Sequence, residues 1–127
     1  MIDHAAGGAL LDAYGRAWET FDGDAWVAIF TEDAEYPGDP FREPLVGHNS
    51  LRAFVLESAD TQRDVDFTVE RHWVSGTTVL AAWQVAFVKR ATGQLVRLAG
   101  FLTAEVAPDS RINRFREWAQ YAPGSAG

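Results

Sequence analysis

Four long segments in the second half of the chain carry the alternating pattern of β-strands. Apolar residues repeat there with a period of two, and β-branched and aromatic residues are frequent. The segments span roughly residues 64–74, 77–90, 94–106 and 111–121. The turns between them contain Gly76, Gly93 and Pro108. Because connections this short join neighbouring antiparallel strands, the sequence predicts consecutive β-hairpins in one sheet.

The segment 77–90 is apolar on both of its faces. One alternating set of residues includes Trp83, and the other set is interrupted only by Gln84. A strand with one face in water would alternate apolar with polar residues, so both faces of this strand are predicted to be covered. Helices can cover one face, and we expect a second copy of the chain to cover the outer face. The alternative is a central strand whose outer apolar side chains are tolerated in solvent.

The first half of the chain carries the spacing of amphipathic helices. The pattern predicts a helix with apolar positions from Leu10 to Phe21, a short helix from the cap at Asp22–Asp24 to a point before Asp33, and a helix from Asn49 or Ser50 to about Asp60. Between the second and third helices, prolines and glycines predict a short strand at Glu35–Tyr36 and an irregular loop.

These elements predict an α+β fold, a cone-shaped barrel in which three N-terminal helices pack on a strongly curved, mostly antiparallel sheet. One domain is expected over residues 1–127, with frayed ends at 1–7 and 122–127. Three short helices cannot fill the whole concavity of strands this long. A pocket is therefore predicted at the open end of the cone.

Composition limits the partners and the chemistry. The 127 residues include no Cys, which excludes a disulfide scaffold, a thiol nucleophile and Cys-ligated zinc. The net charge of −7 argues against nucleic acid. The three histidines have no metal-ligand spacing, and no phosphate-binding loop is present, so neither a metal nor a cofactor is expected. Without a signal peptide pattern or a long apolar run, a cytoplasmic protein with no membrane contact is expected.

Several short segments resemble one known superfamily. They are Tyr14–Trp18, Asp22–Ala34, Gly47 ahead of Leu51–Phe54, and Arg116–Trp118. With the predicted order of elements, they make about residues 8–121 similar to the nuclear transport factor 2-like superfamily, in its SnoaL-like and ketosteroid-isomerase-like branch. The resemblance implies the cone fold. The same cone hosts isomerases, cyclases, dehydratases, epoxide hydrolases and non-catalytic binding proteins, so it does not identify one activity.

The resemblance also implies candidate catalytic residues. Ketosteroid isomerases of this fold use a tyrosine on the first helix, an aspartate base and a second, protonated aspartate on a later strand. Tyr14 matches the tyrosine, and Asp39 lies within one residue of the base, whereas Gly100 stands where the second aspartate is expected. An apolar cavity would raise the pKa of Asp39 and make it a general base. The alternatives are a buried Tyr14 bonded to the backbone and an Asp39 that stabilises a turn.

Glu117 is the third candidate catalytic residue. It shares a face of the last strand with Phe115, which the resemblance places inward, so we expect Glu117 on the pocket wall near Gln84. The alternative is an ion pair with Arg97 or Arg71 across the sheet.

The remaining pocket predictions rest on the inward faces of the helices and strands. The residues expected to line the pocket are Trp18, Trp26, Phe30, Phe54, Gln84, Gly100, Leu102 and Phe115. We expect the cavity to bind a small hydrophobic molecule, with cofactor-independent acid–base catalysis of the isomerase, cyclase or dehydratase type as the leading hypothesis. Asp39 would be the base, and Tyr14 would donate a hydrogen bond to oxygen. The alternative is a non-catalytic dimeric module that binds a ligand or a protein.

Overall fold

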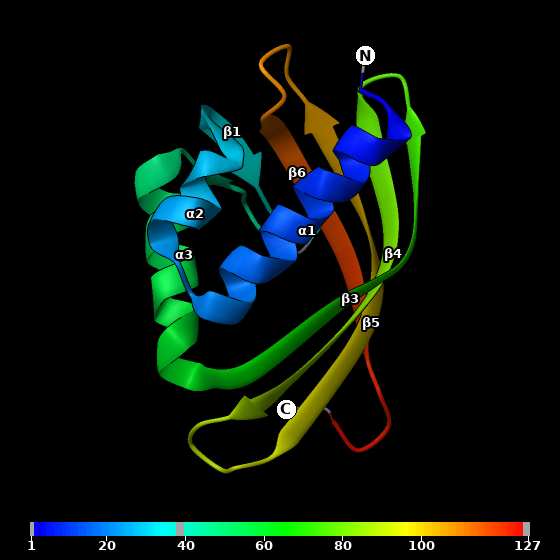
Figure 1. Cartoon of the computed structure of the whole chain (residues 1–127). Coiled ribbons are helices and arrows are strands. Elements are labelled where there is room, and N and C mark those ends of the chain that lie inside the picture. The colour runs from blue at the N-terminus through cyan, green and yellow to red at the C-terminus, as the bar shows by residue number, and fades with distance from the viewer. Residues whose placement is uncertain (1, 38–39, 126–127) are drawn as a thin grey trace.

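The chain folds into three helices and a single six-stranded sheet. The computed structural model describes residues 2–37 and 40–125. The elements are α1 (His4–Thr20), α2 (Gly23–Ala28), β1 (Phe30–Tyr36), β2 (Leu45–Val46), α3 (His48–Thr61), β3 (Gln62–Ser75), β4 (Thr78–Lys89), β5 (Leu95–Val106) and β6 (Ile112–Tyr121). The strand order is β2-β1-β6-β5-β4-β3, and all neighbours are antiparallel except β1 and β6. The predicted α+β cone is confirmed, with the helices gathered on one side of the curved sheet (Figure 1).

The curvature of the sheet has a local cause in β3. Its pairing with β4 is interrupted between Arg63 and Asp66 and again between Val69 and Arg71. Asp64, inside the first interruption, has a φ of 54°, a conformation that Asp adopts more readily than most residues. Extra residues of this kind bend a strand and increase its twist. The bend carries β3 around the helices and leaves one end of the cone open.

Two parts of the N-terminal half differ from the sequence-based expectation. α2 ends at Ala28, and β1 begins at Phe30 rather than at Glu35. Phe30 and Ala34 are buried in β1, which pairs with β6 on one side and with β2 on the other. These pairings join distant segments and outweigh the helical spacing of the local sequence. α1 already begins at His4, within the segment expected to be frayed, and Asp3 caps it by accepting a hydrogen bond from the Ala6 N–H.

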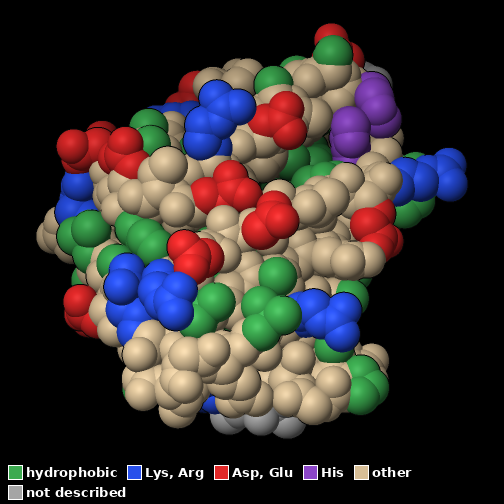
Figure 2. Space-filling model, turned by 60° about the horizontal axis from the view of Figure 1, so that its bottom comes forward, with side chains coloured by type: hydrophobic (Ala, Val, Ile, Leu, Met, Phe, Trp, Pro, Cys, Tyr) green, Lys and Arg blue, Asp and Glu red, His purple; other side chains and the backbone are tan. Residues whose placement is uncertain are grey.

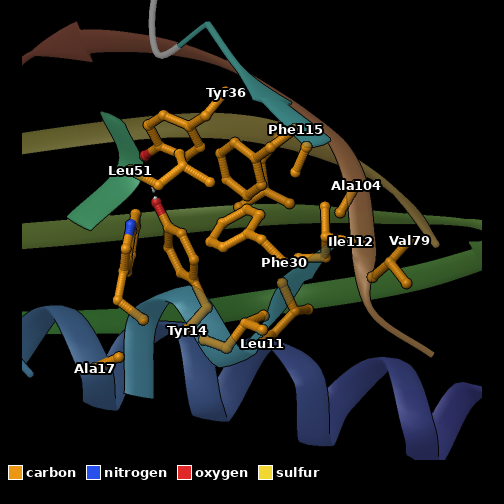
Figure 3. Close-up of a cluster of buried hydrophobic side chains, with 14 of the residues drawn as sticks. Leu11, Tyr14, Ala17, Phe30, Tyr36, Leu51, Val79, Ala104, Ile112 and Phe115 are labelled. Carbon is orange, nitrogen blue, oxygen red and sulfur yellow. Dashed lines mark hydrogen bonds between the residues drawn. The ribbon is translucent and has the colours of Figure 1, made fainter. Parts of the chain in front are cut away.

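An aromatic cluster fills the space between α1, α2, β1 and β6. Tyr14, Trp26, Phe30, Tyr36 and Phe115 are all at most 2% exposed. The Tyr36 and Phe115 rings stack with their centroids 4.8 Å apart, and Tyr14 lies 5.0 Å from Phe115 (Figure 3). Burying aromatic rings of this size is a large part of the stability of a domain. The cluster also closes this end of the cone to a ligand.

The outer face of the sheet has no covering element among the described residues. Trp73, Phe101 and Trp118 lie on this face and are each 36–39% exposed. Arg71 lies over Trp73, and Arg116 lies over Trp118. On a different part of the surface, the bottom of the Figure 1 view brought forward in Figure 2, acidic side chains are interspersed with basic ones. Within the described ranges, no helix has both the length and the hydropathy that a membrane span requires.

Candidate functional site

A cavity of about 560 Å³ opens at the end of the cone that the aromatic cluster leaves unfilled. Its wall is mainly apolar and includes Trp18 of α1, Phe54 of α3, Trp83, Val85 and Phe87 of β4, and Leu98 of β5. Gln62 and Glu117 add polar groups to the wall, and Tyr121 lies at its rim. Cavities of this size and character are typical of small-molecule sites.

A chain of hydrogen bonds leads from the aromatic cluster to the cavity wall. The hydroxyl oxygens of Tyr14 and Tyr36 are 3.0 Å apart and point toward one another (Figure 3). The Tyr36 hydroxyl also bonds to the carboxyl group of Glu117. The three residues come from α1, β1 and β6, and the parallel pairing of β1 with β6 brings the two strands together. Tyr36 therefore connects two candidate catalytic residues that are distant in the sequence.

The surroundings of Glu117 favour the protonated form of its carboxyl group. Burial raises the pKa of its carboxyl group from 4.5 to about 8, and the hydrogen bond from Tyr36 offsets part of this rise. Burial also raises the pKa of Tyr14 and of Tyr36 well above the ordinary value, so both phenols keep their protons. An ionised carboxylate can only accept hydrogen bonds. Once Glu117 loses its proton, Tyr36 donates to Glu117 and Tyr14 donates to Tyr36.

The surroundings of Tyr14 and Glu117 differ from the alternatives considered for them. The Tyr14 hydroxyl bonds to a side chain and not to the backbone. Arg71 lies 4.9 Å from the ring centroid of Trp73, and Arg97 lies on the outer face, so neither arginine is placed to pair with Glu117. Asp39, the predicted base, lies outside the described residues.

The predicted pocket residues fall into three groups. Trp18 and Phe54 line the cavity with Glu117. The residues buried in the core instead of lining it are Trp26, Phe30, Leu102 and Phe115. Gln84 lies on the outer face, where its amide bonds to Glu70, and it cannot reach the cavity. Its placement follows from the alternation of β4, because the neighbouring Trp83 points inward.

Gly100 lies on the inner, helix-covered face of the sheet, but its surroundings leave no room for a side chain. A Cβ atom there would lie 2.1 Å from the backbone oxygen of Trp118 and 2.6 Å from Cζ2 of Trp83. The indole ring of Trp83 therefore occupies the space where the resemblance places an aspartate.

The residues of the site that were not predicted include Tyr36, which links Tyr14 to Glu117, and the cavity residues Gln62, Trp83, Val85, Phe87, Leu98 and Tyr121. Tyr36 and Trp83 each belong to the inward set of a strand, and that alternation is the one signal in the sequence that could have found them. Gln62 lies at the junction of α3 and β3, where no periodicity applies. Within residues 2–37 and 40–125, no group of three His, Asp or Glu side chains could hold a metal ion.

A curved sheet that holds three helices on one face, with ionisable groups inside its open end, defines a nuclear transport factor 2-like protein. Residues 11–115 match the family described as the SnoaL-like domain, and the chain belongs to this family. No curated protein matches the sequence.

Solved structures with different descriptions share the fold. An LEH-like epoxide hydrolase from M. tuberculosis is 17% identical, with 91% of this chain and 84% of that chain covered and a TM-score of 0.77. SalBIII, an epoxide hydrolase/cyclase-like enzyme in pyran ring formation in the polyether salinomycin, is 17% identical, with coverages of 98% and 97% and a TM-score of 0.82. A protein with a ketosteroid isomerase-like fold from Catenulispora acidiphila, in complex with trimethylamine, is 15% identical, with coverages of 91% and 87% and a TM-score of 0.74. At these identities the likeness shows the fold alone.

Proposed function

We propose that the protein is a cofactor-independent acid–base catalyst that binds a small apolar molecule in the cavity and protonates one of its oxygen atoms. The observation that carries this proposal is Glu117, a buried carboxyl group that holds its proton at neutral pH on the wall of an apolar cavity. A carboxylic acid with a pKa near the working pH is an effective general acid.

The hydrogen-bonded tyrosines support the same role. When Glu117 gives its proton to a carbonyl, epoxide or hydroxyl oxygen of the substrate, it becomes a carboxylate in a poorly hydrated place. The Tyr36 hydroxyl then donates to that carboxylate and is itself supported by Tyr14. Donors that are already in position cost no reorganisation when the charge appears.

Proton transfer to oxygen accommodates the isomerase, cyclase and dehydratase types of reaction. In ring closure, the protonated epoxide opens with the electron pair of the C–O bond moving to oxygen. A hydroxyl of the same substrate attacks the carbon, and the proton that it loses returns to Glu117. The epoxide hydrolase and the cyclase-like enzyme with this fold make such substrates reasonable first choices for a screen. The role of Asp39 as a base stays a prediction.

Replacing Glu117 with Gln is expected to lower turnover by at least about 10²-fold, because the amide keeps the shape of the side chain but cannot give up a proton. Purified protein would be screened with a small epoxide, an epoxy alcohol, a β,γ-unsaturated ketone and a β-hydroxy ketone, with products followed by mass spectrometry. Wild-type activity should fall as the pH rises through about 8, where Glu117 loses its proton.

Glu57→Gln is the matched control, since Glu57 is exposed on α3 and does not line the cavity. It should turn over the same substrate at the wild-type rate. Equal rates for Glu117→Gln and the wild type would contradict the acid role. If the cavity binds compounds of all four classes and turns over none of them, the protein is a non-catalytic binding module instead.

We also propose that two copies of the chain associate through the outer sheet face. The half-exposed aromatic residues Trp73, Phe101 and Trp118 lie there, and the same face carries basic Arg71 and Arg116 with acidic residues such as Glu105. A face with both charges and an apolar centre can be complementary to itself across a two-fold axis.

The Phe101→Glu variant is expected to be a monomer, because it places a charge at the centre of this face, whereas the wild type should have the mass of two chains. Light scattering at micromolar protein measures both. Val46→Glu, at an exposed apolar residue of β2 away from this face, should remain a dimer. A monomeric wild type would refute the proposed association.

A further inference from the structure

The indole N–H of Trp83 is an unused hydrogen-bond donor in the interior. Trp83 is only 3% exposed, and its Nε1 atom has no hydrogen-bond partner among the described residues. A buried donor without a partner costs free energy, and most buried polar groups in folded proteins have one. A partner supplied by a ligand would remove this cost.

The position of the ring places this donor beside the cavity. Trp83 lies opposite Gly100 in the sheet and lines the cavity. The Cε2 atom, to which Nε1 is bonded, is 2.9 Å from the place where a Cβ atom of residue 100 would stand. The sheet neighbours of Gly100 on this face include Leu98 and Ala119, which both line the cavity. The nitrogen-bearing edge of the indole therefore lies over Gly100, next to the cavity-lining residues Leu98 and Ala119.

A second donor faces the same space. The Nε1 atom of Trp18 donates to the amide oxygen of Gln62 over 3.0 Å. Because an indole N–H can only donate, the oxygen of the Gln62 amide must face Trp18. The NH₂ group of Gln62 is then directed away from Trp18, and Gln62 lines the cavity. With the protonated Glu117, the wall presents three groups that donate hydrogen bonds.

We propose that the indole N–H of Trp83 donates a hydrogen bond to an oxygen atom of the bound molecule, and that the cavity selects neutral apolar molecules that carry an acceptor at this place. The inference rests on the proposed function in that it places the substrate in the same cavity. Trp83 is a specificity-determining residue in this arrangement, because a molecule without this oxygen leaves its N–H unpaired.

Two naphthalene compounds of the same shape test this donor. The ketone 2-acetylnaphthalene carries a carbonyl oxygen where 2-isopropenylnaphthalene carries a CH₂ group. Wild-type protein should bind the ketone roughly fivefold to tenfold more tightly than the hydrocarbon, as expected for one net hydrogen bond. Trp83→Phe keeps an aromatic ring over Gly100 without the N–H, and it should lose this preference. Trp73→Phe, on the outer face, should keep it.

The five indole N–H resonances of ¹⁵N-labelled wild-type protein give a second measurement of ligand contact. This measurement does not depend on whether Trp83→Phe folds. The Trp83 resonance should shift further with the ketone than with the hydrocarbon, while that of Trp73 stays in place. The inference would be overturned by any of three outcomes. These are equal affinities of the wild type for the two compounds, an unchanged preference in Trp83→Phe, and no binding of either compound. Neither measurement requires turnover, so the acid role of Glu117 stands or fails separately in its own assay.

Discussion

The Glu117→Gln variant is expected to gain stability over the wild type as the pH rises from about 5 to 8. Burial places the pKa of Glu117 at about 8 in the folded protein, against 4.5 for an exposed glutamate. Between these values the unfolded chain releases a proton that the folded chain retains, so the wild type loses stability with rising pH. Glutamine has no such proton. Since one pKa unit corresponds to about 1.36 kcal/mol, the difference should reach about 4 kcal/mol at pH 8 relative to its value below pH 4.5.

Urea unfolding of both proteins at several pH values measures this difference directly. Below about pH 4.5 the acid is neutral in both states, so the two proteins should differ little there. The Glu57→Gln variant, at an exposed glutamate of α3, is the control for the loss of one carboxyl group. A constant difference between Glu117→Gln and the wild type from pH 5 to 8 would mean that Glu117 is ionised in the folded protein.

The sheet could be predicted from the sequence because its signals are local. Alternation over ten or more residues and glycines at the turns located β3 to β6 to within a few residues. The short elements carried no such signal. Phe30 continues the helical spacing of Trp26, yet it pairs with Ile112 of β6 and begins β1. The pairing partner of β1 lies about eighty residues away along the chain, and a local pattern cannot report it.

Individual residues of the candidate site could be predicted from the sequence, but the hydrogen bonds that link them could not. Tyr14 and Glu117 could be assigned to inward faces by periodicity, and the resemblance pointed to Tyr14. Tyr36 links them, and its role depends on where β1 and β6 come together in space. Gln84 was misplaced because a polar residue in an apolar strand suggested a polar group in the cavity, whereas the alternation of β4 sends it outward.

Gly100 is a position at which the packing of the sheet requires a residue without a side chain. The sequence shows only that an expected aspartate is missing. The structure gives the reason, since the backbone oxygen of Trp118 and the ring of Trp83 occupy the space that any side chain would need. Restoring the aspartate would therefore not restore an isomerase site, because β5 and β6 would have to separate first.

Gly100→Ala is accordingly expected to destabilise the protein by about 3 kcal/mol or more, at the upper end of the range for overpacked interiors. The added Cβ atom would lie 2.1 Å from a backbone oxygen, which cannot move without distorting the pairing of β5 with β6. Urea unfolding of Gly100→Ala measures the loss. The double variant Gly100→Ala/Trp83→Phe, compared with Trp83→Phe alone, separates the two contacts. If removing part of the indole ring restores full stability, the ring is the obstacle. We expect most of the loss to remain, because the backbone contact is the shorter one and no change of side chain at position 83 relieves it.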